Sequence, residues 1–201
     1  MSSTARHVHY TYAEYISLED ESSVRHEYLD GEIYAMAGGS PDHAALAFSA
    51  LALLRAPMPR SCRGFTSDLR VRTQTGLATY PDGAIVCGRT MRASDDPLAV
   101  TNPSILIEVT SPSTEDYDRG EKLRHYKSIP SVREILIVSH REPLLTVHRR
   151  GDDGQWSTGA ARTGESVHFP SVAATLSVDE VYSAGLEDAN QPLTADSEKK
   201  T

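Results

Sequence analysis

Long hydrophobic runs are missing from this chain of 201 residues. The longest apolar stretches, at 45–54 and 105–109, are shorter than the roughly 20 residues that a membrane-spanning helix needs. The first residues, MSSTARHVHYTYAEY, lack the apolar segment of a signal peptide. We therefore expect a cytoplasmic protein that has no membrane partner.

Cysteine is scarce, because Cys62 and Cys87 are the only two residues of this type. Their spacing fits no zinc-binding motif, and nothing in the sequence requires a disulfide. The sequence predicts two free thiols, buried or half-exposed.

Positive charge is in deficit, since 20 basic residues stand against 28 acidic ones and the net charge is −8. This balance argues against a surface that coats phosphates everywhere. It does not exclude a nuclease, because carboxylates that hold Mg²⁺ are themselves acidic and the surface could still carry local basic residues, but it argues against tight binding of DNA.

Repeats and low-complexity segments are also absent. We expect a polar lead-in at 1–10, a single domain at 11–184 and a disordered polar tail at 185–201.

Several local signals predict the first elements of the domain. Thr11 and Glu14 form a capping box for a short helix at 12–19. The Asp30-Gly31 pair between alternating segments predicts a β-hairpin. Ser40 is suited to cap a long helix that has Pro41 at its first position. Strands are expected at 65–73, 84–88 and 104–110.

A β-α-β unit follows, with a strand at 104–110, a helix at 115–128 and a strand at 133–139. Such a crossover makes its two strands parallel. Shorter strands at 144–150, 156–161 and 166–169 and a last helix at 177–185 complete the pattern. The expected fold class is α/β, of the mixed α+β kind, with a mixed β-sheet flanked by helices.

Three charged residues occupy informative places in this pattern. Glu108 interrupts an apolar strand, Asp82 begins the strand before it, and Lys122 lies on the helix after it. A buried carboxylate is costly unless it is paired or binds a metal. Lys122 and Glu108 lie at comparable depth in a β-α-β unit. Two carboxylates with a lysine can hold Mg²⁺ and hydrolyse a phosphodiester.

Four segments in this order resemble the Uma-type restriction endonucleases, a bacterial branch of the PD-(D/E)xK nuclease superfamily. They are HEYLDGEIYAMAGGSPDHAAL, YPDGAIV, PSILIEVTSPST and DRGEKLRHYKSIPSVREILIV. The resemblance spans residues 11 to about 150. It implies a restriction-endonuclease-like core and an endonuclease that hydrolyses DNA with Mg²⁺, or with Mn²⁺ in its place. By analogy it also implies a homodimer, for which the strand SVREILIVS and the C-terminal strands offer apolar edges.

The resemblance assigns Asp82 and Glu108 as metal ligands. The superfamily's usual lysine position is Thr110 here, so Lys122 on the following helix is the candidate replacement. Accessory candidates share the helix face of Lys122, follow the helix cap at Ser40 or flank the hairpin turn: Asp118, Tyr126, His43, Glu27 and Glu32.

Other interpretations remain open for each residue. Asp82 could simply start a turn, Glu108 could pair with Arg70, Arg72 or Lys122, and Lys122 could be an exposed helix lysine paired with Asp118. The basic residues at 60–72 could line a DNA groove or solvate an edge strand. The alternative function is a catalytically inactive nuclease fold that serves as an interaction or regulatory module. A different hydrolase that uses the same carboxylates ranks third.

Overall fold

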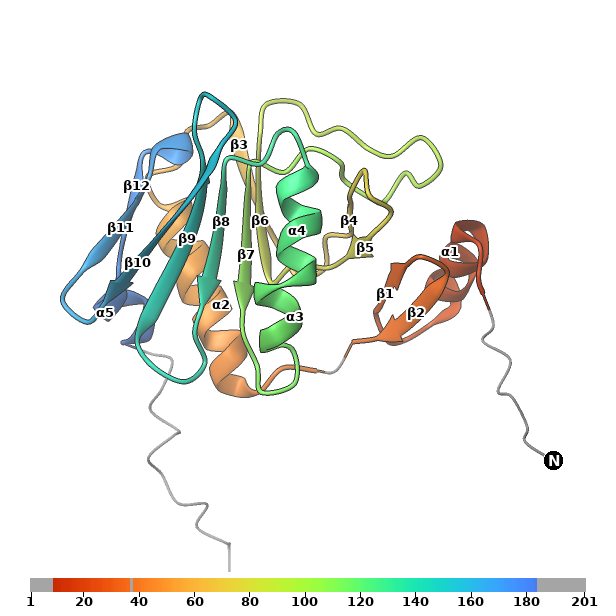
Figure 1. Cartoon of the computed structure of the whole chain (residues 1–201), viewed down its shortest axis with the longest axis horizontal. Helices are drawn as coiled ribbons and strands as arrows, with labels where there is room; N and C mark the ends of the chain where they lie inside the picture. The colour runs from red at the N-terminus through yellow and green to blue at the C-terminus, as the bar shows by residue number, and fades with distance from the viewer. Residues whose placement is uncertain (1–8, 37, 184–201) are drawn as a thin grey trace, which may run out of the picture.

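The computed structural model describes residues 9–36 and 38–183 (Figure 1). Its helices are α1 (Tyr12–Glu21), α2 (Pro41–Arg55), α3 (Glu115–Arg119), α4 (Glu121–Ser128), the 3₁₀ helix η1 (Pro170–Val172) and α5 (Val178–Tyr182). Its strands are β1 (His26–Leu29), β2 (Glu32–Ala35), β3 (Cys62–Thr66), β4 (Val71–Arg72), β5 (Ala78–Thr79), β6 (Gly83–Cys87), β7 (Ile105–Val109), β8 (Glu134–Val138), β9 (Leu144–Arg150), β10 (Trp156–Arg162), β11 (Ser166–Phe169) and β12 (Ala174–Ser177). The mixed α+β class predicted from the sequence is confirmed.

A six-stranded sheet with the order β10-β9-β8-β7-β6-β3 forms the centre of the molecule. Strands β7 and β8 are parallel, and the other neighbours in this sheet are antiparallel. The predicted β-α-β unit is therefore confirmed as β7, α3–α4 and β8.

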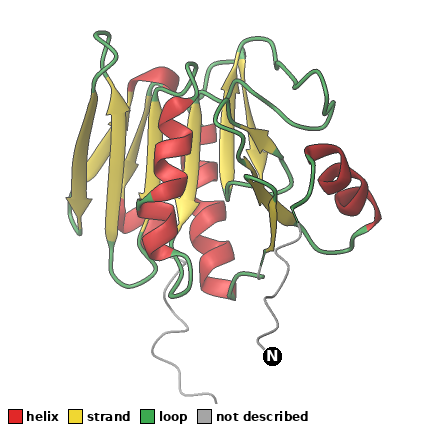
Figure 2. Cartoon of the chain, turned by 45° about the vertical axis from the view of Figure 1, so that its right-hand side comes forward, coloured by secondary structure: helices red, strands yellow, loops and turns green. Residues whose placement is uncertain are grey.

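Helices cover both faces of this sheet. Side chains alternate along its buried strands, so each strand contributes residues to the core on either face. Ile107 and Val109 of β7 belong to the core that α2 and α5 cover. Leu106 belongs to the opposite core, where Leu123 and Tyr126 of α4 pack. Figure 2 shows these helical layers on either side of the strands. Glu108 consequently points toward α4.

A second, smaller sheet with the order β2-β1-β5-β4 lies beside α1 (Figure 1). Its β1–β2 hairpin turns at Asp30 and Gly31, whose φ angles of 49° and 86° are both positive. Two positive φ angles define the turn that suits a two-residue hairpin, as the sequence predicted. The predicted caps at Thr11 and Ser40 are also confirmed.

The helix predicted at 115–128 is interrupted, which corrects the sequence prediction. It divides at Gly120 into α3 and α4. A Cβ atom at this position would lie 2.7 Å from the carbonyl oxygen of Asp116, so the close approach requires glycine. The single strand predicted at 65–73 is likewise divided into the end of β3 and the short β4.

The prediction of free thiols is wrong, because Cys62 and Cys87 form a disulfide. The two cysteines stand directly opposite each other on the antiparallel strands β3 and β6. Sequence spacing carries no information about this register, which brings their Cα atoms to 3.9 Å.

The strand SVREILIVS is not an edge, contrary to the expectation from the sequence. It forms β8, which lies between β7 and β9 and is buried along its length. The edges of the six-stranded sheet are β10 and β3. Of the two interpretations of the basic residues at 60–72, the one that places them on an edge strand is confirmed for β3. No helix within the described residues is long and apolar enough to cross a membrane.

Candidate active site

Lys122 is buried among three carboxylates, with 4% of its surface exposed. Its Nζ atom lies 3.0 Å from Oε1 of Glu108, 3.0 Å from Oε1 of Glu27 and 3.7 Å from Oδ1 of Asp118. The interpretation of Lys122 as an exposed surface lysine is therefore wrong. Its ammonium group is instead the centre of a buried acidic cluster.

The carboxylates around Lys122 come from separate parts of the fold. Glu108 lies on the central strand β7, and Asp118 lies on α3, one helical turn before Lys122. Glu27 comes from β1 of the smaller sheet, where it also accepts a hydrogen bond from Thr79 of β5. The cluster thus joins the two sheets through the first turn of α4.

Asp82 approaches the same end of the large sheet from the start of β6. Gly83 of β6 pairs with Ile107 of β7. Because the two strands are antiparallel, Asp82 lies opposite Glu108. Oδ2 of Asp82 accepts a hydrogen bond of 2.7 Å from the backbone N–H of Val109. The carboxylate is thereby fixed beside the strand that carries Glu108, which excludes a simple turn role.

His43 reaches Asp82 from the first turn of α2. Its Nε2 atom lies 3.3 Å from Oδ2 of Asp82 and 3.0 Å from the carbonyl oxygen of Val109. Both neighbours are acceptors, so Nε2 carries the proton and donates. His43 and the backbone N–H of Val109 therefore both hold Oδ2 of Asp82.

Tyr126 fixes Glu108 from α4, since its hydroxyl donates a hydrogen bond of 2.5 Å to Oε1. The predicted helix face of Asp118, Lys122 and Tyr126 thus points into the cluster. Glu32, the other acid beside the hairpin turn, accepts a hydrogen bond from Tyr34 on its own strand. Thr110, at the usual lysine position, contacts His140 Nδ1 at 2.8 Å.

Burial and surplus negative charge govern the protonation of this cluster. Burial raises the pKa of Glu108 well above its usual value, and the charges of Asp82 and Asp118 raise it further against the opposing effect of Lys122. Burial likewise raises the pKa of Asp118. Burial alone would lower the pKa of Lys122, but Glu108 and the other acidic groups raise it well above its usual value. Lys122 is therefore a permanent cation at neutral pH.

The pKa of His43 is raised as well, chiefly because its ring donates to the Asp82 carboxylate. Burial acts in the opposite direction. The imidazole and Lys122 are thus the two groups that can offset the surplus negative charge of the site.

The donor set suits a magnesium ion. Mg²⁺ is bound through one or two carboxylates and completes its shell with water and phosphate oxygens. The contacts described above engage Oδ2 of Asp82 and Oε1 of Glu108, which leaves one further oxygen on each carboxylate. Within residues 9–36 and 38–183, no three His, Cys, Asp or Glu side chains gather to hold a metal by themselves. A site with two carboxylate ligands, Asp82 and Glu108, agrees with the further oxygen that each of them has and with this finding.

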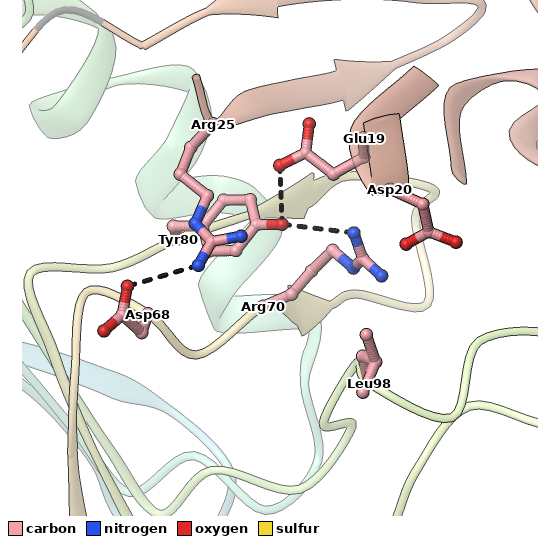
Figure 3. Close-up of a pocket in the computed structure, with 7 residues that line it drawn as sticks. All are labelled: Glu19, Asp20, Arg25, Asp68, Arg70, Tyr80 and Leu98. Carbon is pink, nitrogen blue, oxygen red and sulfur yellow. Dashed lines mark hydrogen bonds and ion pairs between the residues drawn. The ribbon is translucent and has the colours of Figure 1, made fainter. Parts of the chain in front are cut away.

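A separate polar cluster fixes the strand that carries Glu27. The carboxylate of Glu19 accepts hydrogen bonds from the Tyr80 hydroxyl and from the backbone N–H of His26, the residue before Glu27. Arg70 binds Tyr80 and forms a buried ion pair with Asp96. Figure 3 shows Glu19, Tyr80 and Arg70 of this cluster. They line a pocket with a volume of about 180 Å³. The contacts of the cluster are internal pairs, so its role is to hold α1 and β1 in place.

Sequence reasoning did not find Thr79 or Tyr117 as neighbours of Glu27. Thr79 binds Glu27 across the smaller sheet, and Tyr117 has a raised pKa because it is buried next to that carboxylate. Neither residue stands in a motif. The Thr79 contact depends on the pairing of β1 with β5, and the Tyr117 contact on how the smaller sheet packs against α3.

The mixed sheet flanked by helices has the architecture of a nuclease fold. A protein from Anabaena variabilis ATCC 29413, described as "a putative nuclease belonging to DUF820", has a similar structure. Its TM-score is 0.69 at 21% sequence identity, and the match covers 85% of this chain and 96% of that one.

Two proteins of Synechocystis sp. are similar in sequence. The uncharacterized protein slr1290 is 33% identical over 171 residues, which are 84% of this chain and 89% of the relative. The uncharacterized protein sll1609 is 30% identical over 148 residues, which are 73% and 84%. The family profile Uma2, described as "Putative restriction endonuclease", matches residues 12–179. The chain belongs to the Uma2 family.

Proposed function

We propose that the protein is a metal-dependent endodeoxyribonuclease that uses Mg²⁺ or Mn²⁺. The observation that carries this proposal is the burial of Lys122 against Glu108 beside Asp82. A charged cluster of this kind is costly to bury, and it lies where neighbouring strands present their carboxylates together. Family membership and the shared fold support the same function.

Asp82 and Glu108 are proposed as the metal ligands. A bound Mg²⁺ ion would polarise a phosphoryl oxygen and lower the pKa of a coordinated water. The backbone of Val109 and the ring of His43 hold the Asp82 carboxylate, and Tyr126 holds that of Glu108. Ligands fixed in this way need no rearrangement when the substrate arrives.

Lys122 acts as a hydrogen-bond donor and a positive charge. Its raised pKa keeps the ammonium protonated at neutral pH, so it orients water and stabilises charge that develops on the phosphate. It does not abstract the proton from the attacking water. Glu27, which lies 3.0 Å from Nζ of Lys122 and is not assigned to the metal, is the carboxylate suited to receive that proton.

An inactive interaction module is the second candidate. It would be favoured by a Lys122 that faces solvent or by a Glu108 locked to an arginine. Lys122 is buried, and the partners of Glu108 are Lys122 and Tyr126 rather than an arginine, which favours the enzyme. The Glu108–Lys122 ion pair itself is expected from both the catalytic and the purely structural interpretation of Glu108. A hydrolase for another substrate with the same carboxylates remains third, because no observation on the site favours it.

The test is cleavage of supercoiled plasmid and of single-stranded DNA by the wild type and by Glu108→Gln, with Mg²⁺ or Mn²⁺. The control is Glu134→Gln. Glu134 is also buried and lies on the neighbouring strand β8, but at the opposite end, where it binds Ser171. We expect metal-dependent cleavage by the wild type and Glu134→Gln, and a rate at least about 10²-fold lower for Glu108→Gln.

Cleavage that survives in Glu108→Gln would contradict the proposal and point to another site or to a contaminating nuclease. Absence of cleavage in every condition would favour the interaction module. A homodimer and a cytoplasmic location belong to the proposal as well, the dimer because nucleases that cut both strands need two active sites.

A further inference from the structure

A row of basic side chains lies on the face of the large sheet beside the α3–α4 pair. We call it the basic strip, and it comprises Arg141, Arg119, His148, Lys127 and Arg150, with Trp156 at its end. The side chains come from the β8–β9 loop, α3, α4, β9 and β10. Alternation along β9 and its pairing with β10 put His148, Arg150 and Trp156 on one face.

Contacts join successive members of the strip. Glu115 pairs with Arg141 at 2.8 Å and with Arg119 at 3.2 Å. His148 lies two residues before Arg150 on the same face of β9. Burial, and then the charges of Lys127 and Arg119, lower the pKa of His148 to about 4, so its imidazole is neutral at pH 7.

Trp156 marks the far end of the strip. The Nζ atom of Lys127 lies 5.5 Å from the centre of its ring, and the guanidinium carbon of Arg150 lies 4.8 Å from it. Arg150 also donates to the carbonyl oxygens of Lys127 and Pro130 at the end of α4. At this end of the strip, Lys127 and Arg150 are thus held by neutral partners, which leave their positive charges unbalanced.

The charge of the strip is opposite to that of the whole protein. Four permanent cations face the single carboxylate of Glu115, whereas the chain carries a net charge of −8. The adjacent pairs Arg162–Glu142 and Arg133–Asp152 are each balanced. Arg141 is well exposed, at 64% of its side chain, and the other members are partly exposed.

The strip begins at the candidate active site. Arg119 follows Asp118 directly in the sequence, and Lys122 lies three residues further on. From there the strip follows β9, whose seven residues span about 20 Å, the length of several nucleotides. Basic side chains along such a path, with an aromatic ring among them, suit a strand of nucleic acid.

We infer that the basic strip binds the sugar-phosphate backbone of the DNA that the candidate active site cleaves, with Trp156 in contact with a base. The identity of the ligand as DNA rests on the proposed function. Phosphates exchange with Glu115 for Arg119 and Arg141, because a guanidinium binds phosphate and carboxylate with the same geometry.

The first test uses Trp156 as a reporter, since it is the single tryptophan of the chain. Labelled duplex and single-stranded oligonucleotides are titrated with the full-length protein in EDTA, so that no cleavage occurs. Binding is followed both by anisotropy of the label and by tryptophan emission. We expect both signals to change with the same midpoint.

The second test compares three variants by anisotropy. Arg119→Gln and Arg141→Gln should each weaken binding to duplex DNA and reduce the slope of log K against log salt by about 0.9. Glu115→Gln removes the competing carboxylate and should tighten binding several-fold, a gain that misfolding would not produce. The control is Arg89→Gln, an exposed arginine that follows β6 at the end of the strand remote from Asp82, which should bind as the wild type does.

Two results would contradict the inference that the strip binds DNA and leave the nuclease proposal standing: DNA binding with unchanged tryptophan emission, and affinities that these substitutions do not alter. Absence of binding even at low salt would contradict the same inference. Binding through the strip by a protein that never cleaves DNA would leave the inference standing and refute the proposed activity.

Discussion

At the scale of single residues, the site consists of one buried cation and an excess of buried carboxylates. Glu108 and Asp118 are 3% and 4% exposed, as is Lys122 at 4%. Their mutual repulsion is offset by the ammonium group that lies among them. Glu108 and Lys122 could be predicted from the local sequence. Glu108 is a charge within an apolar strand, and Lys122 lies on the following helix at a similar distance along the β-α-β unit.

Lys122→Met should destabilise the fold by about 3–5 kcal/mol, because it leaves buried carboxylates without their cation. The raised pKa of Glu108 sets the pH dependence. A carboxyl group with a raised pKa binds a proton in the folded state where the unfolded chain does not, so the variant should regain stability as the pH falls from about 8 to about 5.

Urea unfolding of the metal-free proteins at both pH values measures this effect. The control is Lys127→Met, whose ammonium contacts the Trp156 ring rather than a carboxylate. A pH-independent loss in Lys122→Met would contradict the role assigned to Glu108.

His43→Asn should weaken metal binding, because Asp82 loses the ring that orients it. Partners of this kind typically change metal affinity by about 10–100-fold. The Mg²⁺ or Mn²⁺ concentration for half-maximal cleavage should rise accordingly, while the rate at saturating metal is largely kept. His168→Asn, at an exposed position on β11, is the control. An unchanged half-maximal concentration would remove His43 from the site.

At the scale of elements, packing decides what local patterns leave open. The sequence predicted β7, the crossover helix and β8, because apolar runs and helix signals are local. It did not reveal which acid of the hairpin meets Lys122. Glu27 does so because β1 packs near α4, and this arrangement depends on the Arg70–Asp96 pair and on Glu19, far apart along the chain.

The disulfide is a second feature that only packing reveals. It closes a loop with a sequence separation of 25 residues between β3 and β6. Restricting the unfolded chain by such a loop contributes about 3 kcal/mol. Cys62→Ala with Cys87→Ala should therefore lower the unfolding free energy by about that amount under oxidising conditions.

Reduction of the wild type should have the same effect on urea unfolding as the double substitution, and it should leave the double variant unchanged. Labelling of the denatured, unreduced protein with a thiol-reactive dye gives the direct measurement. Two reactive thiols in that experiment would contradict the disulfide.

At the scale of the whole molecule, the order of the elements along the chain predicted the fold. The charge of its surfaces and the edges of its sheet could not be predicted in the same way. The deficit of positive charge hides the basic strip, since Arg119, Lys127 and Arg150 are scattered along the sequence and meet only through the α3–α4 and β9–β10 arrangement. The prediction that SVREILIVS forms a sheet edge is wrong for the same reason, whereas the C-terminal strand β10 is an edge. Burial of β8 follows from its neighbours in the sheet, which its own apolar sequence does not identify.

A homodimer is expected in solution, because cleavage of both strands of a duplex needs two copies of the site. Light scattering at the protein concentration used for cleavage should give twice the mass of one chain. A monomer that linearises plasmid in a single binding event would contradict this expectation.

The central claim is that Asp82, Glu108 and Lys122 act as one site, and it is tested most directly by the rates of single and combined substitutions. The measurement is the initial rate of plasmid cleavage at saturating metal for Asp82→Asn, Glu108→Gln, Lys122→Met and the triple variant. Each single change should lower the rate by about 10²-fold or more, and the triple variant should be no slower than the slowest single one. Independent losses that multiply in the triple variant, or any single variant that cleaves like the wild type, would contradict the account.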